Sequence, residues 1–341
     1  MDVLQAFRLG VRKTNQAKRI IFFAWLVNTA LAMTVVLPML SRLDDYIGDT
    51  VMEEQLLEQI DANWLQTFKE DYKDNDLVGA LDYTIFGAAP FLVHYDSYLS
   101  GSVIRPIGRF FFDLIFRLRI GFEYLGPLTI LAFLYVLAST FLASGFVGMF
   151  AKDYRLSFQE FLIEGAKYFG RFFRLSVLSL IVYMIVFGTL LDWWAQSIPL
   201  WTANERSEMV PFVHYMIKNG TTVLLLGFLT LCFDYAKIRI VLEDRLSGLF
   251  ASWAGLKFVL QHFFPTTGLY LFLSLIGIAA ILFTVSLQGM VHPSGYWTIL
   301  FVFLIQQVYL GVRLWVRALF YASQTQLAQR HLRIQGLSAL R

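Results

Sequence analysis

The chain has 341 residues, of which 57% are hydrophobic, 17% aromatic and only 16% charged, with a formal net charge of +3. Soluble domains of this size contain less apolar material, so the composition excludes an ordinary soluble globular protein. A net charge this small gives no support to nucleic acid as a partner. We therefore expect a protein whose solvent is the lipid bilayer.

Six apolar runs are long enough to cross a membrane. A helix needs about 20 apolar residues to span a hydrocarbon core of roughly 30 Å. The runs cover about residues 20–40, 124–150, 175–198, 221–241, 267–291 and 297–321. The sequence therefore predicts an all-α integral membrane protein with six transmembrane helices.

The first predicted segment, residues 1–40, combines an amphipathic helix with span one. Residues 1–19 carry five basic residues and one acidic residue, so the positive-inside rule places the N-terminus in the cytosol. A secretory signal cleaved after Ala32 is the alternative. The apolar run continues to Leu40, however, and this length favours a complete span.

Residues 41–122 form a predicted outer, acidic, helical insertion. Between residues 41 and 100 there are thirteen acidic and three basic residues, which indicates an outside location. Thr50 and Glu53 form a capping-box pair that opens a helix. The apolar side of this helix is a candidate partner-binding face made of Leu57, Ile60, Trp64 and Phe68. This apolar side must be covered by another protein, by the membrane surface, or by another part of the insertion.

The stretch 77–99 is apolar enough to raise a seventh span. Asp82, Pro90, His94 and Asp96 interrupt it. A seventh span would also place the basic segment 152–174 outside, against the charge rule. We therefore expect a packed or partly re-entrant segment here, followed by an interfacial helix at 107–119.

Residues 123–341 are predicted to form a five-span core with cytosolic interfacial helices at 157–174 and 246–264. In the first of these helices the apolar side is Phe158, Phe161, Leu162, Phe169, Phe172 and Phe173, and Glu160, Glu164, Lys167, Arg171 and Arg174 form the polar side. In the second, the apolar stripe is Leu246, Leu249, Phe250, Trp253, Leu256, Leu260, Phe263 and Phe264. We expect both helices to lie in the headgroup layer, and span six to continue as a cytosolic helix into a basic C-terminal tail.

A short pattern occurs three times. Glycine is followed by lysine at Gly10 and Lys13, Gly165 and Lys167, and Gly255 and Lys257, each time upstream of paired phenylalanines and a span. We interpret this as three hairpin repeats, each led by a cytosolic amphipathic helix and related by an axis along the membrane normal. A chance match, given the abundance of glycine and aromatic residues, is the alternative.

Two of these segments carry a resemblance. SFQEFLIEGAKYFGRFFRLSVLSL and FDYAKIRIVLEDRLSGLFASWAGLKFVLQHFF are similar to bacterial multi-pass membrane proteins of uncharacterised function. These include the membrane domain attached to some glycerophosphodiester phosphodiesterases. The resemblance covers about residues 151–290, and the insertion at 41–122 departs from it. It implies a bacterial cytoplasmic (inner) membrane location and brings no catalytic residues.

The residue types that carry catalysis are scattered. The five histidines have no metal-ligand spacing and the single cysteine, Cys232, has no intrachain partner. We expect no metal, no cofactor and no enzymatic activity. Asp234, the carboxylate nearest to the membrane interior, is predicted to form a structural ion pair with Arg313 or Arg317.

These observations favour a non-enzymatic scaffold or accessory subunit of a larger bacterial membrane complex, with lipids and other membrane subunits as partners. The alternative is a transporter or lipid-handling protein with its site on the pseudo-threefold axis. A membrane enzyme ranks third because no acid, base or metal set is clustered.

Overall fold

The computed structural model describes residues 3–47, 67–68, 70–71, 127–152, 157–205, 207–291 and 296–338. Every regular element in this part of the chain is a helix, which confirms the all-α prediction. The capping-box pair, the stretch 77–99 and the helix at 107–119 lie outside the described residues, so these expectations stay predictions.

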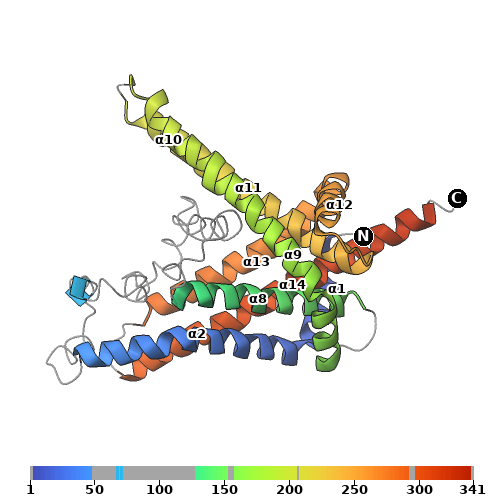
Figure 1. Ribbon diagram of the computed structural model, residues 1–341, viewed down its shortest axis with the longest axis horizontal. Coiled ribbons are helices and arrows are strands. Elements are labelled where there is room, and N and C mark those ends of the chain that lie inside the picture. The colour runs from blue at the N-terminus through green and yellow to red at the C-terminus, as the bar shows by residue number, and fades with distance from the viewer. Residues whose placement is uncertain are drawn as a thin grey trace, which may run out of the picture. The chain divides into compact units, whose positions relative to one another are not determined.

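Ten helical segments follow one another along the described chain. They are α1 (Val3–Gln16), α2 (Lys18–Ile47), α8 (Pro127–Phe150), α9 (Phe158–Ile185), η3 (Val186–Leu190), α10 (Leu191–Trp201), α11 (Met209–Leu242), α12 (Gly248–Gln261), α13 (Phe263–Gly289) and α14 (Tyr296–Ser338) (Figure 1). Segment η3 is a π-helical stretch within the continuous helical run from α9 to α10.

In the part of the chain that the structure describes, four stretches are long and apolar enough to cross a membrane: Phe133–Phe150, Phe158–Trp201, Phe263–Gly289 and Tyr296–Leu332. They overlap the second, third, fifth and sixth predicted runs. The helices α2 and α11 occupy the positions of the first and fourth runs. The structure thus agrees with a multi-pass membrane protein, and the full count of six spans stays a prediction.

The chain divides into two compact units, and each is described by itself. The first comprises the described residues within Met1–Pro90, Leu125–Tyr168 and Phe264–Arg341. The second comprises those within Phe91–Tyr124 and Phe169–Phe263. Helix α9 begins in the first unit and continues in the second.

The core of the first unit lies around the middle of α14. From Ala318 to Thr325 every side chain is buried, and so are Leu327 and Ala328. Helix α14 contacts α1, α2 and α8, and its Phe320 ring lies 5.5 Å from the ring of Tyr270 on α13. A helix buried on all sides is a core element rather than a surface one. The prediction that span six continues as one helix is therefore correct, but this continuation is enclosed by its neighbours.

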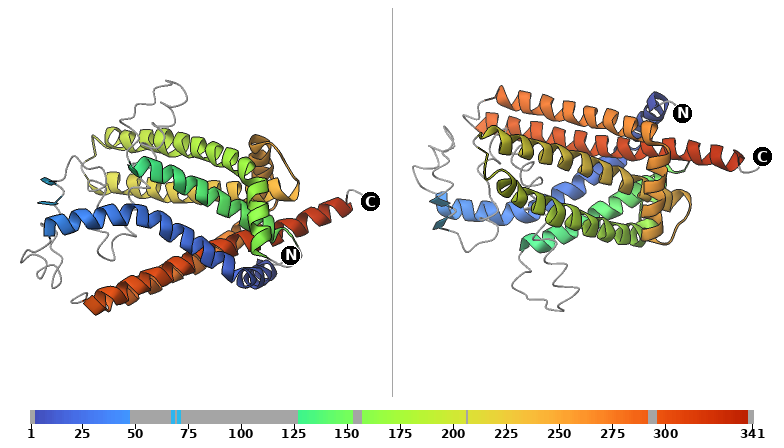
Figure 2. Two further views of the ribbon diagram at one scale, coloured as in Figure 1. Left: turned by 60° about the horizontal axis from the view of Figure 1, so that its bottom comes forward. Right: turned by 90° about the horizontal axis from the view of Figure 1, so that it is seen from above.

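Helix α1 packs on α14 through small residues. Its buried face is Ala6, Gly10 and Thr14, which lie four residues apart on one side of the helix. A Cβ atom on Gly10 would lie 2.0 Å from the Ser323 hydroxyl oxygen. Only glycine allows this approach, and Figure 2 shows α1 crossing α14 close to the N-terminus.

Helix α9 extends beyond the helix predicted at 157–174, whose interfacial location stays a prediction. The helix runs without interruption past Arg174 to Ile185. The Ser157 hydroxyl accepts a hydrogen bond from the Glu160 N–H at its start, and no proline lies between Phe158 and Ile185. From Phe158 to Trp201 the helical run contains 44 residues, a length of about 66 Å and twice the thickness of a hydrocarbon core.

Helix α12, by contrast, is separate from the helix after it. It ends at His262, where φ is −123° and ψ is 41°. Pro265 follows within the first turn of α13, the part of a helix that tolerates a residue lacking an N–H. The chain therefore breaks between the two helices, as the predicted interfacial segment at 246–264 requires.

In the second unit, the run from α9 to α10 lies antiparallel to α11 (Figure 1). The Tyr183 and Thr230 hydroxyls are hydrogen bonded at 3.1 Å, and α10 contacts α11. Helix α12 packs on α11 through Ala251, Ala254, Gly255, Phe258 and Val259. A Cβ atom on Gly255 would lie 2.7 Å from the Ala236 nitrogen and the Cys232 carbonyl oxygen, so here two helix backbones are in contact.

Candidate functional site

The C-terminal end of α8 collects polar side chains from distant parts of the first unit. Lys13 on α1 donates hydrogen bonds to the Phe150 and Lys152 carbonyl oxygens at 2.9 and 3.2 Å. Gln329 on α14 donates to the Ala151 carbonyl oxygen. The last carbonyls of a helix have no partner within the helix, and a lysine also complements the negative end of its dipole. These side chains therefore cap α8 and hold three helices together.

A buried ion pair stands beside this cap. Lys152 Nζ lies 2.6 Å from Glu164 Oε1 on α9, and the Glu164 side chain is 5% exposed. Ser144 donates a hydrogen bond to the Gly165 carbonyl oxygen at 3.0 Å. A Cβ atom on Gly148 would lie 2.7 Å from the Glu164 Cβ, so α8 and α9 touch closely at this point.

Glu164 is a residue that the sequence interpretation misplaced. Its helical position put it on the polar side of the predicted interfacial helix, whereas the structure buries it. Phe158 and Leu162, on the predicted apolar side, are exposed at 43% and 36%, so the chain itself does not cover this part of that side. The available signal was the pair of small residues Ser144 and Gly148, because small residues four apart mark a close helix contact.

Thr14 on α1 and a short segment of α14 contain buried polar atoms without hydrogen-bond partners. Within the described chain, Thr14 Oγ1, Ser323 Oγ, Thr325 Oγ1 and both amide atoms of Gln324 have no hydrogen-bond partner. All four residues have no exposed surface. Most buried polar groups in proteins are paired, so this cluster carries an energetic cost.

In the second unit the buried carboxylate is Asp234. It has no exposed surface, and Lys237 one turn later lies 3.0 Å from its Oδ1 atom. The predicted pairing with Arg313 or Arg317 stays a prediction, because both arginines belong to the first unit. Within that unit, Arg317 Nε donates a hydrogen bond to the Tyr321 hydroxyl at 3.1 Å.

Further charges join α9 to the loop after α11. Arg171 forms an ion pair at 2.5 Å with Asp244, a residue with a positive φ of 51°. Arg239 pairs with Glu243 at 2.7 Å, one turn apart on the helix and its end. These contacts fix the turn that leads into α12.

The predicted partner-binding face is described at one position only. Leu57, Ile60 and Trp64 lie outside the described residues. Phe68 is buried, with its ring 5.0 Å from that of Tyr46 at the end of α2. Tyr46 also donates a hydrogen bond to Asp71 at 2.9 Å. At this position the chain itself therefore supplies a contact.

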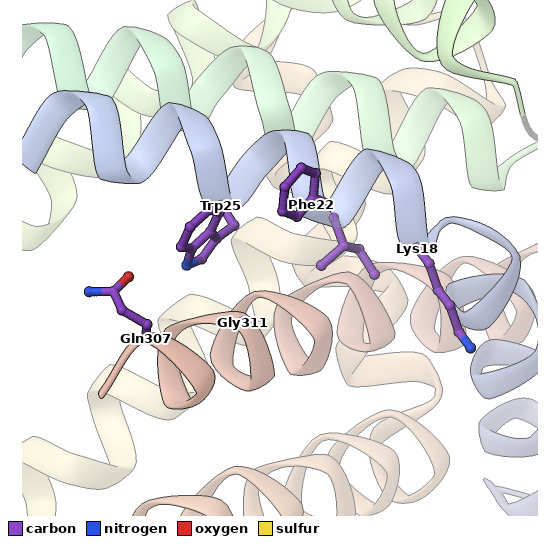
Figure 3. A pocket seen from close by; sticks show the side chains of 6 residues that line it. Lys18, Phe22, Trp25, Gln307 and Gly311 are labelled. Carbon is purple, nitrogen blue, oxygen red and sulfur yellow. The ribbon is translucent and has the colours of Figure 1, made fainter. Parts of the chain in front are cut away.

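A groove runs between α2 and α14 in the first unit. Its walls are Ile21, Phe22 and Trp25 on α2 and Gly311 on α14. Lys18 and Gln307 lie at opposite ends (Figure 3). Its volume is about 300 Å³. The sequence interpretation missed the groove, since none of its residues belongs to a recognisable motif.

Among the described residues, no group of three or more histidine, cysteine, aspartate or glutamate side chains could hold a metal ion. No protein-family model, no curated protein and no solved structure matches the chain. The resemblance to the membrane domain of some glycerophosphodiester phosphodiesterases stays a prediction.

Proposed function

We propose that the chain is a multi-pass scaffold or accessory subunit of a larger complex in a bacterial cytoplasmic membrane. The observation that carries this proposal is the outer face of α12. Leu249, Phe250, Trp253 and Leu260 are each more than half exposed, while the opposite face packs on α11. An apolar face of this kind needs cover by lipid or by another subunit.

The use of polar side chains supports the same proposal. Lys13, Gln329, Lys152 and Glu164 cap or pair with neighbouring helices. Such contacts fix helix positions, which is the property that a scaffold requires. We assign the chain no enzymatic role and no cofactor.

We further propose six spans in three hairpin repeats, with both termini in the cytosol. The order of helices supports this arrangement. Helices α1, α9 and α12 each contain the glycine of the recurring pattern, α1 and α12 precede the long helices α2 and α13, and α9 begins the run that ends at Trp201. In two of the three cases, α1 and α12, the leading helix is separate from the next one.

The test asks which surface binds the partner. The protein is extracted in mild detergent, and co-purifying polypeptides are quantified relative to it. If the insertion binds the partner, Ile60→Ser with Trp64→Ala releases it while the protein stays monodisperse. If α12 binds it, Phe250→Ser with Trp253→Ser releases it. The matched control is Leu200→Ser, because Leu200 is an exposed apolar residue on α10. A chain that co-purifies with no polypeptide at all contradicts the subunit proposal.

A lipid-handling protein is the second candidate. The groove between α2 and α14 favours it, because its walls are apolar and it holds a basic residue at one end. A site on the pseudo-threefold axis belongs to the same candidate.

A further inference from the structure

The groove between α2 and α14 has an apolar middle and polar ends. Figure 3 shows Phe22 and Trp25 on α2 between Lys18 at one end and Gln307 at the other. The Phe22 and Trp25 rings stack with their centroids 5.5 Å apart and their planes at 20°. Seven residues separate Lys18 from Trp25, so the apolar wall extends about 10 Å along the helix axis.

On α14 the groove is lined by a glycine. A Cβ atom on Gly311 would meet no atom within 4 Å. At Gly10 and Gly255, by contrast, the missing side chain lets two helices touch. Gly311 therefore leaves space that the chain does not fill.

The charge at one end of the groove is positive and available. Lys18 is exposed, and within the described chain it forms no ion pair. Arg12 and Arg19, on the neighbouring turns of α1 and α2, are exposed as well. In the proposed topology this end lies at the cytosolic boundary of span one, where basic residues meet lipid phosphates.

We propose that this groove binds one anionic phospholipid. One acyl chain lies against Phe22 and Trp25 in the space left by Gly311, and Lys18 binds the phosphate of the headgroup. Apolar burial holds the chain, and the ammonium selects lipids with net negative charge over zwitterionic ones. This inference goes beyond the scaffold proposal, because a scaffold needs no selective lipid site.

The test is a lipid competition on the full chain. Delipidated protein in detergent receives equimolar phosphatidylglycerol and phosphatidylethanolamine with identical acyl chains, and native mass spectrometry counts the retained lipids. We expect one retained phosphatidylglycerol and a preference of about fivefold, the effect of one basic residue near an anionic lipid. Lys18→Gln removes the preference.

Two further variants separate charge from space. Gly311→Leu fills the groove, so neither lipid is retained. Its control is Gly220→Leu, since a side chain at Gly220 also meets open space and does not line the groove. Lys257→Gln removes an exposed lysine elsewhere and leaves the preference unchanged. Thermal unfolding of each variant in detergent shows that it is folded.

Three results overturn the proposal. The first is equal retention of both lipids by the wild type. The second is a preference that falls equally in Lys18→Gln and Lys257→Gln. The third is a cross-link to a polypeptide instead of a lipid, formed in membranes by a photo-reactive residue that replaces Phe22. That result would assign the groove to a partner helix.

Discussion

Charged side chains in this protein stabilise helix contacts where water is largely excluded. Glu164 is nearly enclosed, with Lys152 as its ion-pair partner, while the Lys152 side chain is 30% exposed. A buried carboxylate that loses its counter-charge keeps its desolvation cost and gains nothing in return. A lysine that loses its partner can turn to water. Loss of Lys152 is therefore expected to destabilise the fold more than loss of the Glu164 charge.

We expect Lys152→Met to lower the free energy of unfolding by about 2 kcal/mol, and Glu164→Gln by about half as much. The double variant loses less than the sum of the two single losses, because neither charge is left alone. Denaturation of the purified proteins by an ionic detergent measures the loss of unfolding free energy in each single variant and in the double variant. Equal and additive losses would show that the two side chains do not interact.

At the scale of whole helices, contacts between small residues set the distances. Helix α1 approaches α14 at Gly10, and α12 approaches α11 at Gly255. The two contacts differ in what opposes the glycine. The atoms nearest to Gly10 belong to the Ser323 side chain, with the Ser323 Cα at 3.0 Å, whereas all those nearest to Gly255 are backbone atoms of α11, which cannot move alone.

Gly255→Ala is therefore expected to push α12 away from α11 and to lower the stability of the fold by about 2 kcal/mol. Gly170→Ala on α9 is the matched control, since its new methyl group meets no atom within 4 Å. That variant keeps or slightly raises stability, because alanine favours helix more than glycine does. Thermal unfolding in detergent compares the two. A Gly255→Ala protein as stable as the Gly170→Ala protein would argue against the close contact of α11 and α12.

At the scale of the whole molecule, the proposed orientation in the membrane rests on the distribution of charge. Residues 1–19 are basic and residues 41–100 are acidic, so the positive-inside rule predicts that span one runs outward. With the six spans proposed, the C-terminus is expected in the cytosol.

Single cysteines test this topology in a Cys232→Ser background, because the chain contains no other cysteine. We expect Asp61→Cys to react with an impermeant thiol reagent from outside intact cells. Lys167→Cys, at an exposed position on α9, reacts only after the membrane is opened. Labelling of both from the same side would contradict the six-span topology.

The sequence by itself determined the helical class, the positions of the long apolar helices and the apolar stripe of α12. Length and periodicity are local properties, and Phe250 and Trp253, which the sequence places on the apolar stripe, are both exposed on α12. Tertiary structure alone decided that Glu164 points inward, that the segment from Ala318 to Thr325 is enclosed, and that Lys13 caps α8. The physical reason is that lipid and protein interior are equally apolar. A hydrophobic pattern therefore shows that a face avoids water but not which neighbour covers it.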